Sequence, residues 1–312
     1  MERLARRYSL VPLRDLVQRL SLGTLRPGEA AITFDDGYAG VYEHAFPVLR
    51  RMGLPATIFV VTRYADSGGA FWWDRLAWHL SRRAGRRLAL PPALGGRAVR
   101  LDPPRRLWGI QADLQRRLGR MEGAARDRLL DALGAEAPPY SRPLGWSQIE
   151  EMRRHGFAVE AHTHAHPFLT GLPGDALREE LAISRDRIAD RLGGAPSLFA
   201  YPFGDAGPRE ARAVRAAGFS AAFTTEPARC ACGSPPYRLP RLLVGNWDEA
   251  ALESRLEALR GPAGVAARAY AHLKMSVPAA VAVRVRGVRR ALAPRRGAPA
   301  GGDAGRPGPG EA

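Results

Sequence analysis

Short apolar runs alternate with longer amphipathic segments along most of the chain. Runs rich in β-branched and aromatic residues predict strands at residues 29–34, 56–61, 157–161, 197–201 and 219–224. A shorter apolar run predicts a further strand at residues 242–244. Apolar residues at helical spacing predict helices at residues 10–20, 38–52, 146–155, 173–192, 208–217 and 248–259. This repeated order of strand and helix is typical of parallel sheets, whose neighbouring strands are joined by crossover helices.

Residues 64–145 interrupt this alternation. Phe71-Trp72-Trp73-Asp74 opens a predicted helix, an Arg-, Pro- and Gly-rich stretch follows at residues 82–106, and helical spacing then returns. We interpret the segment as a long insertion at the edge of a barrel. Two interpretations of the tryptophan pair stay open: a surface on which sugars stack, or a packed anchor.

The strand–helix repeat carries no glycine fingerprint for a dinucleotide, so we expect a (β/α) barrel rather than an open doubly wound sheet. We expect a helical lead-in, a main domain, a basic amphipathic helical extension and a disordered Pro- and Gly-rich tail, at residues 1–28, 29–260, 261–293 and 294–312. Residues 265–293 hold six basic residues, no acidic residue and an apolar stripe. That extension fits either a helix on a membrane surface or a terminal helix docked on the barrel.

The composition is that of a soluble globular protein, with 46% hydrophobic and 25% charged residues among 312. The net charge of +16 suits nucleic acid, an anionic membrane surface or an acidic glycan as a partner. No recognition helix, zinc finger or aromatic RNA-binding signature accompanies the charge, so we expect no nucleic-acid partner. The two cysteines, Cys230 and Cys232, cannot build a disulfide framework.

The basic N-terminal residues are followed by no long apolar run, so they do not resemble a secretory signal. No stretch approaches the roughly 20 apolar residues that span a bilayer. We therefore expect a cytoplasmic protein, or one that contacts a membrane peripherally through residues 265–293. The oligomeric state is not predicted.

Two adjacent carboxylates end the first clear strand, at Asp35 and Asp36 before Gly37. Alternation along a strand places neighbouring side chains on opposite sides, so one acid can bind a metal while the other handles a proton. The competing interpretation is an ordinary Asp-Gly turn after a strand.

Three histidines lie within five residues, His162, His164 and His166, directly after the predicted strand at residues 157–161. His162 leaves the strand end, and a turn can bring His166 back beside it. Two neutral imidazoles and one carboxylate make a good zinc site with a fourth position open for water. The carboxyl ends of parallel strands meet at one face of a barrel, so the acid pair is well placed to complete the site. The competing interpretation is a polar loop with incidental imidazoles.

Thr33-Phe34-Asp35-Asp36-Gly37, taken with His162-Thr163-His164-Ala165-His166, resembles the first two motifs of the polysaccharide deacetylase family, the NodB-homology domain of the carbohydrate esterase family 4 type. The similarity covers about residues 10–250 and includes the segments 54–59, 71–74, 200–204 and 239–241. The resemblance implies a distorted (β/α)7 barrel, a divalent metal that is usually zinc, and hydrolysis of N-acetyl groups on an amino-sugar polysaccharide or glycan intermediate.

Matched by motif, the resemblance gives each residue of the two motifs a role. Asp36, His162 and His166 would bind the metal, Asp35 would be the general base, and His164 would point away. A backbone N–H near Phe203 would stabilise the oxyanion of the tetrahedral intermediate. The residues expected to contact the substrate are Tyr201, Phe203, Gly204 and Trp247.

Three features depart from the family pattern. No arginine stands near Ala200-Tyr201, where many members carry the one that orients the base, so Arg241 is the candidate replacement. No late Leu-x-x-His motif supplies a general acid, which stays unassigned. Relatives also have a strand ahead of the helix at residues 10–20, so we expect either a late start at Met1 or an incomplete barrel.

These departures keep alternatives to the N-deacetylase open. One is an O-acetyl esterase, or an amidase of a non-sugar carbon–nitrogen bond, that uses the same metal chemistry. Another, from a different class, is a catalytically impaired carbohydrate-binding protein that keeps the metal without turnover.

Overall fold

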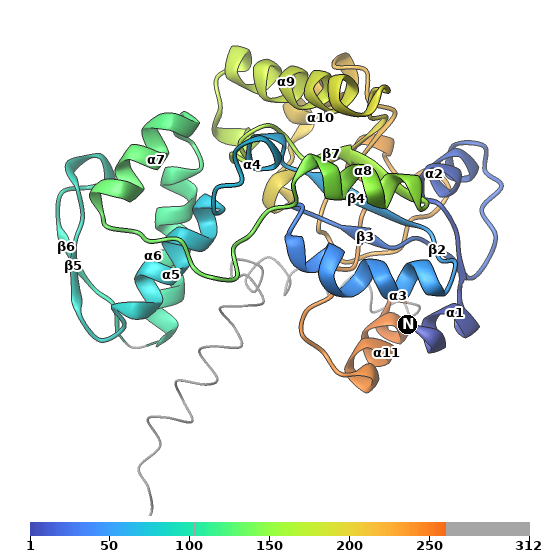
Figure 1. The fold of residues 1–312 in the computed structure, drawn as a ribbon, viewed down its shortest axis with the longest axis horizontal. Coiled ribbons are helices and arrows are strands. Elements are labelled where there is room, and N and C mark those ends of the chain that lie inside the picture. Colours follow the sequence, from blue (N-terminus) through green and yellow to red (C-terminus); the bar gives the residue numbers. More distant parts are fainter. Residues whose placement is uncertain (103, 260–312) are drawn as a thin grey trace, which may run out of the picture.

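The computed structural model describes residues 1–102 and 104–259. Its centre is a sheet of five parallel strands in the order β3-β4-β7-β8-β9 (Figure 1). The bounds of these strands are Thr33–Phe34, Ala56–Val60, Phe157–Ala161, Leu198–Ala200 and Ala221–Phe223. The sheet curls into a half-barrel with helices packed around it, so the predicted distorted barrel is confirmed.

The strand β4 lies in the interior of the sheet, and its sequence is apolar enough to be buried on both faces. All five of its residues are buried, and it pairs with β3 on one side and β7 on the other. A strand covered on both faces reads as a continuous apolar run, as residues 56–60 do. The helices between the strands, α3, α8, α9 and α10, span Phe46–Arg51, Trp146–Arg154, Gly174–Leu192 and Pro208–Ala216.

A short π-helix, Val41–Ala45, precedes α3, and Pro47 lies at the start of α3. The predicted single helix over residues 38–52 is therefore two joined helical segments. Proline lacks the N–H that a continuous α-helix needs, which accounts for the change of helical type beside it.

The fully buried carboxylate of Glu160 connects α2 (Leu13–Ser21) to the sheet. The Arg14 side chain, on α2, donates to Glu160 Oε1 at 2.6 Å. The other oxygen, Oε2, accepts the backbone N–H groups of Ser197 and Leu198 at 2.8 Å each. The polar residue inside the apolar strand β7 thus has its hydrogen bonds satisfied.

The N-terminal region differs from the prediction. After α1 (Glu2–Arg7), the strand β1 (Ser9–Leu10) pairs in parallel with β2 (Glu29–Ala30). A strand therefore does precede the helix at residues 13–21, and the expectation of a missing one is wrong. The predicted strand at residues 29–34 is divided into β2 and β3.

The predicted strand at residues 242–244 is also wrong. Leu243 and Val244 are 51% and 58% exposed and lie in an irregular segment before α11 (Glu249–Ala258). The bridge to β9 forms earlier, between Leu239 and Phe223. Leu239 is fully buried, so the apolar residue that joins the sheet lies three positions before the predicted run.

After α4 (Thr62–Ser67), which contacts α9, the residues up to 135 form a second lobe beside the sheet (Figure 1). The elements of the lobe are α5, β5, β6, α6 and α7, with bounds Trp72–Arg82, Arg87–Ala89, Ala98–Arg100, Pro104–Leu118 and Gly123–Ala132. The lobe has its own core, built around Phe71, Trp72, Leu76, Leu114 and Leu130. The Arg-, Pro- and Gly-rich stretch, which predicted no element, forms the antiparallel pair β5–β6.

Trp72 and Trp73 are 0% and 3% exposed, so the packed anchor is the correct interpretation of the pair. The helical extension at residues 261–293, its membrane contact through residues 265–293 and the tail at residues 294–312 lie outside the described residues. Within residues 1–102 and 104–259, no helix combines the length and apolar character that a membrane crossing requires.

Candidate active site

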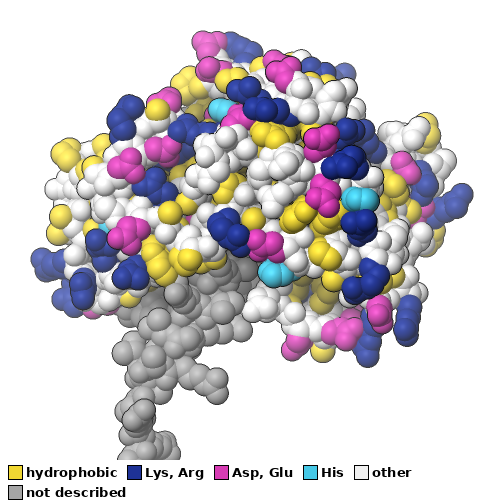
Figure 2. Space-filling model, viewed as in Figure 1, with side chains coloured by type: hydrophobic (Ala, Val, Ile, Leu, Met, Phe, Trp, Pro, Cys, Tyr) yellow, Lys and Arg dark blue, Asp and Glu magenta, His cyan; other side chains and the backbone are white. Residues whose placement is uncertain are grey.

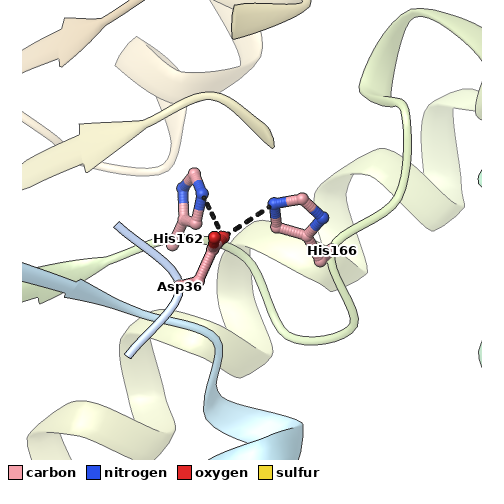
Figure 3. A group of neighbouring side chains, drawn as sticks. All are labelled: Asp36, His162 and His166. Carbon is pink, nitrogen blue, oxygen red and sulfur yellow. Dashed lines mark ion pairs between the residues drawn. The ribbon is translucent and has the colours of Figure 1, made fainter. Parts of the chain in front are cut away.

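Asp36, His162 and His166 converge beyond the carboxyl ends of β3 and β7 (Figure 3). Asp36 Oδ1 lies 3.3 Å from His162 Nε2 and 3.2 Å from His166 Nε2. Each residue offers one ligand atom, and these atoms lie within 4.8 Å of one another. Both imidazoles are buried, whereas Asp36 is partly exposed. The two imidazole nitrogens of the cluster are therefore shielded from solvent, whereas the carboxylate is accessible to it.

The orientation of His162 is fixed from behind. Its Nδ1 lies 2.7 Å from the carbonyl oxygen of Ala200 at the end of β8. A carbonyl can only accept, so Nδ1 carries a hydrogen, and Nε2, which faces Asp36, is the nitrogen left to bind a metal. This arrangement is the usual one for a histidine that binds a metal through Nε2.

The loop from His162 to His166 is held by its neighbours. Glu180 Oε2, on α9, accepts the backbone N–H groups of His164 and Ala165 at 2.9 and 2.8 Å. Thr163 Oγ1 accepts the backbone N–H of His166 at 3.0 Å. The His164 ring contacts Thr62 Oγ1 at 2.9 Å and lies outside the cluster. These contacts bring His166 back beside His162.

Residues with an unusual backbone conformation gather around the cluster of Asp36, His162 and His166. Among the described residues, four that are not glycine have a left-handed φ: Asp36, Thr163, His166 and Phe203, at 71°, 67°, 56° and 58°. Each such residue costs roughly 1–3 kcal/mol and persists only where its surroundings impose it. The sequence predicted none of this strain, because Asp and His adopt the conformation only occasionally, and Thr and Phe more rarely still.

The protonation of the cluster suits a divalent cation. Burial lowers the pKa of His166 to about 4, against the opposing effect of Asp36, so this imidazole is neutral at pH 7. Burial raises the pKa of Asp36, but the hydrogen bonds from His162 and His166 outweigh it and the pKa lies well below its usual range. Burial lowers the pKa of His162, but Asp36 and Asp35 outweigh it and raise the pKa. Two imidazoles around one carboxylate thus leave a place for positive charge, which a divalent metal fits.

Asp35 faces the other way and is paired with Arg241. The Arg241 Nη1 and Nη2 groups donate to Asp35 Oδ1 and Oδ2 at 2.8 and 2.7 Å. Nη1 also lies 3.2 Å from Thr33 Oγ1, and Nε donates to the carbonyl of Thr224 at 3.1 Å. Burial raises the pKa of Asp35, but Arg241 and His162 outweigh it and lower the pKa. The two acids face different partners, as predicted, but alternation along a strand is not the reason, because β3 ends at Phe34 and Asp36 has a left-handed φ. The carboxylate beside Arg241 is ionised.

The expected substrate residues fall in different places. Tyr201 is fully buried and its hydroxyl donates to the carbonyl of Tyr237 at 2.9 Å, so its side chain is a core residue and not a substrate contact. Phe203 stacks on Phe168 with ring centroids 4.1 Å apart and meets the His166 ring at 4.5 Å. Phe203 therefore does lie at the cluster.

Gly204 and Trp247 have different surroundings. A Cβ at Gly204 would lie 2.0 Å from Thr225 Oγ1, and the residue has φ of 70°, so only glycine fits there. The Trp247 ring packs under the Arg255 guanidinium, 4.1 Å away, beside α11. A contact of Trp247 with substrate stays a prediction.

Sequence reasoning missed an aromatic support from the second lobe. The Trp73 ring lies 4.0 Å from the His166 ring, and its Nε1 donates to Tyr38 Oη at 2.9 Å. Tyr38 in turn donates to Asp74 Oδ2 at 2.8 Å. Burial raises the pKa of Asp74 to about 7, against the opposing hydrogen bond of Tyr38. The signal available in the sequence was the run Phe71–Asp74, in which one acid follows three aromatic residues, and the structure shows all four buried.

Comparisons with known proteins agree with this geometry. The family model described as polysaccharide deacetylase matches residues 23–222, more than half of the chain. The putative polysaccharide deacetylase YxkH of Bacillus subtilis (strain 168) is 22% identical over 213 residues, which are 68% of this chain and 50% of that protein. The chain thus spans about half the length of this curated relative.

Two solved structures share the fold. The Streptococcus pyogenes deacetylase PplD, in complex with acetate, has a TM-score of 0.55 and 16% identity over 83% of this chain and 82% of its own. IcaB from Ammonifex degensii has a TM-score of 0.51 and 22% identity over 83% and 84%. The family model matches residues 23–222, so the chain belongs to the polysaccharide deacetylase family.

Proposed function

We propose that this chain is a metal-dependent deacetylase that removes N-acetyl groups from an amino-sugar polysaccharide or glycan intermediate. The observation that carries the proposal is the division of the acid pair: Asp36 faces two imidazoles and Asp35 faces Arg241. A lone Asp-Gly turn has no reason to hold both arrangements within one strand end.

Asp36, His162 and His166 would hold the divalent cation, and zinc suits two imidazoles and one carboxylate. When bound, the cation supplies activation of water and polarisation of the acetyl carbonyl. The Ala200 carbonyl keeps His162 Nε2 turned toward the cluster, and Glu180 keeps the loop of His166 closed. The chain's own contribution is thus a preformed set of ligands.

Asp35 is the proposed general base. It is ionised, since Arg241 lowers its pKa, and can therefore accept the proton of the attacking water at its carboxylate. Arg241 holds it with two parallel hydrogen bonds, which fix both the position and the plane of the carboxylate. The backbone N–H of Phe203 is the proposed donor to the oxyanion, and such a donor typically contributes about 10²–10³ in rate.

Acetate release tests the proposal. The purified chain is incubated with N-acetylglucosamine oligomers, with and without a chelator, and free acetate is measured alongside bound metal. We expect about one metal per chain and acetate release that the chelator abolishes. O-acetylated glycans in parallel distinguish an esterase on the same metal site.

The rival from another class is a carbohydrate-binding protein that retains the metal without turnover. The missing late Leu-x-x-His motif favours it, and the intact Asp35–Arg241 pair argues against it. Metal bound stoichiometrically with no acetate released from any acetylated glycan would establish the rival and end the deacetylase proposal.

A further inference from the structure

A surface cavity of about 320 Å³ lies at the C-terminal end of α5, in the second lobe. Its volume is at the lower end of the range of about 300–1,000 Å³ that small-molecule sites occupy. Its aromatic and charged lining residues are Trp78, His79, Arg82, Arg83, Arg86 and Glu136. None of them belongs to the metal cluster, so the cavity is a separate place on the molecule.

The cavity is positively charged because three arginines line it against one glutamate. Within the described residues, Arg82, Arg83 and Arg86 form no ion pair with a carboxylate. Some other arginines are paired with carboxylates of the same lobe, such as Arg63 with Asp127 and Arg75 with Asp131. The face shown in Figure 2 likewise has basic side chains interspersed with acidic ones. What distinguishes this place is that three guanidinium groups without a carboxylate partner line one cavity.

Two of the three guanidinium groups are held in place by contacts that leave their charge intact. The Arg82 guanidinium carbon lies 5.4 Å from the centre of the Trp78 ring. Arg83 Nη1 lies 3.0 Å from His79 Nδ1. Neither a ring face nor an imidazole neutralises a guanidinium, so the cavity keeps its positive field while the side chains lose freedom. Such ordering before binding favours affinity.

His79 supports one of these guanidinium groups from inside the lobe. Its side chain is buried, with 2% exposure of the residue, and its Nε2 is enclosed by the protein. Burial, followed by the nearby charge of Arg83, lowers the pKa of His79. A neutral imidazole whose Nδ1 contacts Arg83 holds that guanidinium without adding charge to the cavity.

Helix geometry alone does not explain the cluster. Arginines at the end of a helix interact favourably with its dipole. The final carbonyls of α5, those of Leu80 and Ser81, already accept the backbone N–H of Arg83. The dipole also gives no reason for a cavity to form between the guanidinium groups.

We propose that this cavity is a binding site for an oxyanion, a phosphate or carboxylate group carried by a larger ligand. The planar fork of arginine matches the two oxygens that both groups present, and charge-assisted hydrogen bonds of this kind are the strong ones. The proposal does not depend on deacetylation, since none of its residues contacts the metal cluster.

Calorimetric titration of the full chain tests it, with inorganic phosphate in one arm and glucuronate in the other, at constant ionic strength. We expect one saturable site in at least one arm. Arg82→Gln with Arg86→Gln should weaken binding about tenfold or more, because two charge-assisted donors are lost. The matched control is Arg153→Gln with Arg154→Gln, which removes the same charge from the exposed end of α8 and should leave the affinity within about twofold.

Equal weakening in both double variants would mean that net charge alone attracts the anion, and the site would be refuted. Absence of saturation with both probes would refute it as well. Should the glutamine double variant fail to fold in thermal unfolding, Arg82→Lys with Arg86→Lys replaces it. Lysine keeps the charge but not the fork, so the expected loss is about threefold.

Discussion

The half-barrel and the second lobe contribute to the candidate active site in different ways. The half-barrel supplies the charged groups, Asp35, Asp36 and His162 at strand ends and His166 in the loop after β7. The second lobe contributes no residue to the cluster of Asp36, His162 and His166, but its Trp73 packs against the ring of His166. The proposed chemistry thus belongs to the half-barrel, and the second lobe supports one of the proposed ligands. An element without a catalytic motif can therefore still determine how a ligand is held.

The strongest test of this division removes the half-barrel's ligands. His162→Ala combined with His166→Ala should abolish stoichiometric metal binding and lower acetate release on the order of 10³-fold or more. The loss is expected because Asp36 would then be the one proposed ligand left in the cluster. Metal content and acetate release are measured together, with His44→Ala as the control, since that side chain is 82% exposed. Full activity in the double variant would refute the metal site.

The next test concerns the lobe's buried acid, Asp74. Its pKa is raised from 3.8 to about 7, so the folded state holds the proton more tightly than the unfolded state. This group's contribution to stability is therefore present below about pH 4 and declines as the pH rises toward 7, by up to about 4 kcal/mol. Asp74→Asn should flatten that decline in the free energy of unfolding measured by denaturant titration.

Asp113→Asn is the control for Asp74, because its carboxylate is on the surface of α6 and 45% exposed. It should leave the pH profile of stability unchanged. A decline that persists undiminished in Asp74→Asn would show that the buried carboxyl is not its origin.

The half-barrel's base is tested through its partner. Arg241→Lys should lower acetate release about 10–100-fold, since an ammonium cannot hold both oxygens of Asp35. The weaker partner also raises the pKa of Asp35 toward its usual range, so the acid limb of the pH–rate profile moves to higher pH. Arg212→Lys, on the exposed side of α10, is the control. An unmoved acid limb would contradict the assignment of Asp35 as base.

The smallest expected effect belongs to the lobe's aromatic support. Trp73→Phe keeps a ring beside His166 but loses the hydrogen bond from Nε1 to Tyr38. We expect acetate release to fall about tenfold at unchanged metal content. Trp146→Phe loses a comparable indole hydrogen bond, to Asp66, at a distance from the cluster and serves as the control. If the two substitutions lowered acetate release equally, the second lobe would have no specific role in supporting His166.

The sequence predicted the half-barrel better than the lobe for a physical reason. Strands such as β4 and β7 are continuous apolar runs, because both faces are buried, and their ends are marked by polar residues. The strands β5 and β6 are short and mostly exposed, and they lie among arginines and glycines, so no apolar run predicted them. The exposed run at residues 242–244 misled for the opposite reason, since its apolar residues never enter a sheet.

The sequence could predict which residues form the candidate site, because their types and their positions after strands are visible in the motifs. The two motifs identified Asp35, Asp36, His162 and His166, and the geometry brings them to one face. The pairing of Arg241 with Asp35 could only be offered as a candidate, because a contact across 206 positions depends on the whole fold. The burial of Tyr201 was hidden for the same reason, since a motif does not show which way its side chains turn.

That separation along the chain has a consequence for the order of events during folding. Asp35 meets Arg241 only after the intervening sheet has closed, and closing a long loop is slow because its entropy is lost before its contacts form. The cluster of Asp36 and His162, 126 residues apart, comes together earlier in the sequence of strands. A chain growing from its N-terminus therefore carries its proposed metal ligands well before the proposed base meets Arg241. The proposed catalytic arrangement is completed last, when Arg241 joins the segment after β3 to the segment beyond β9.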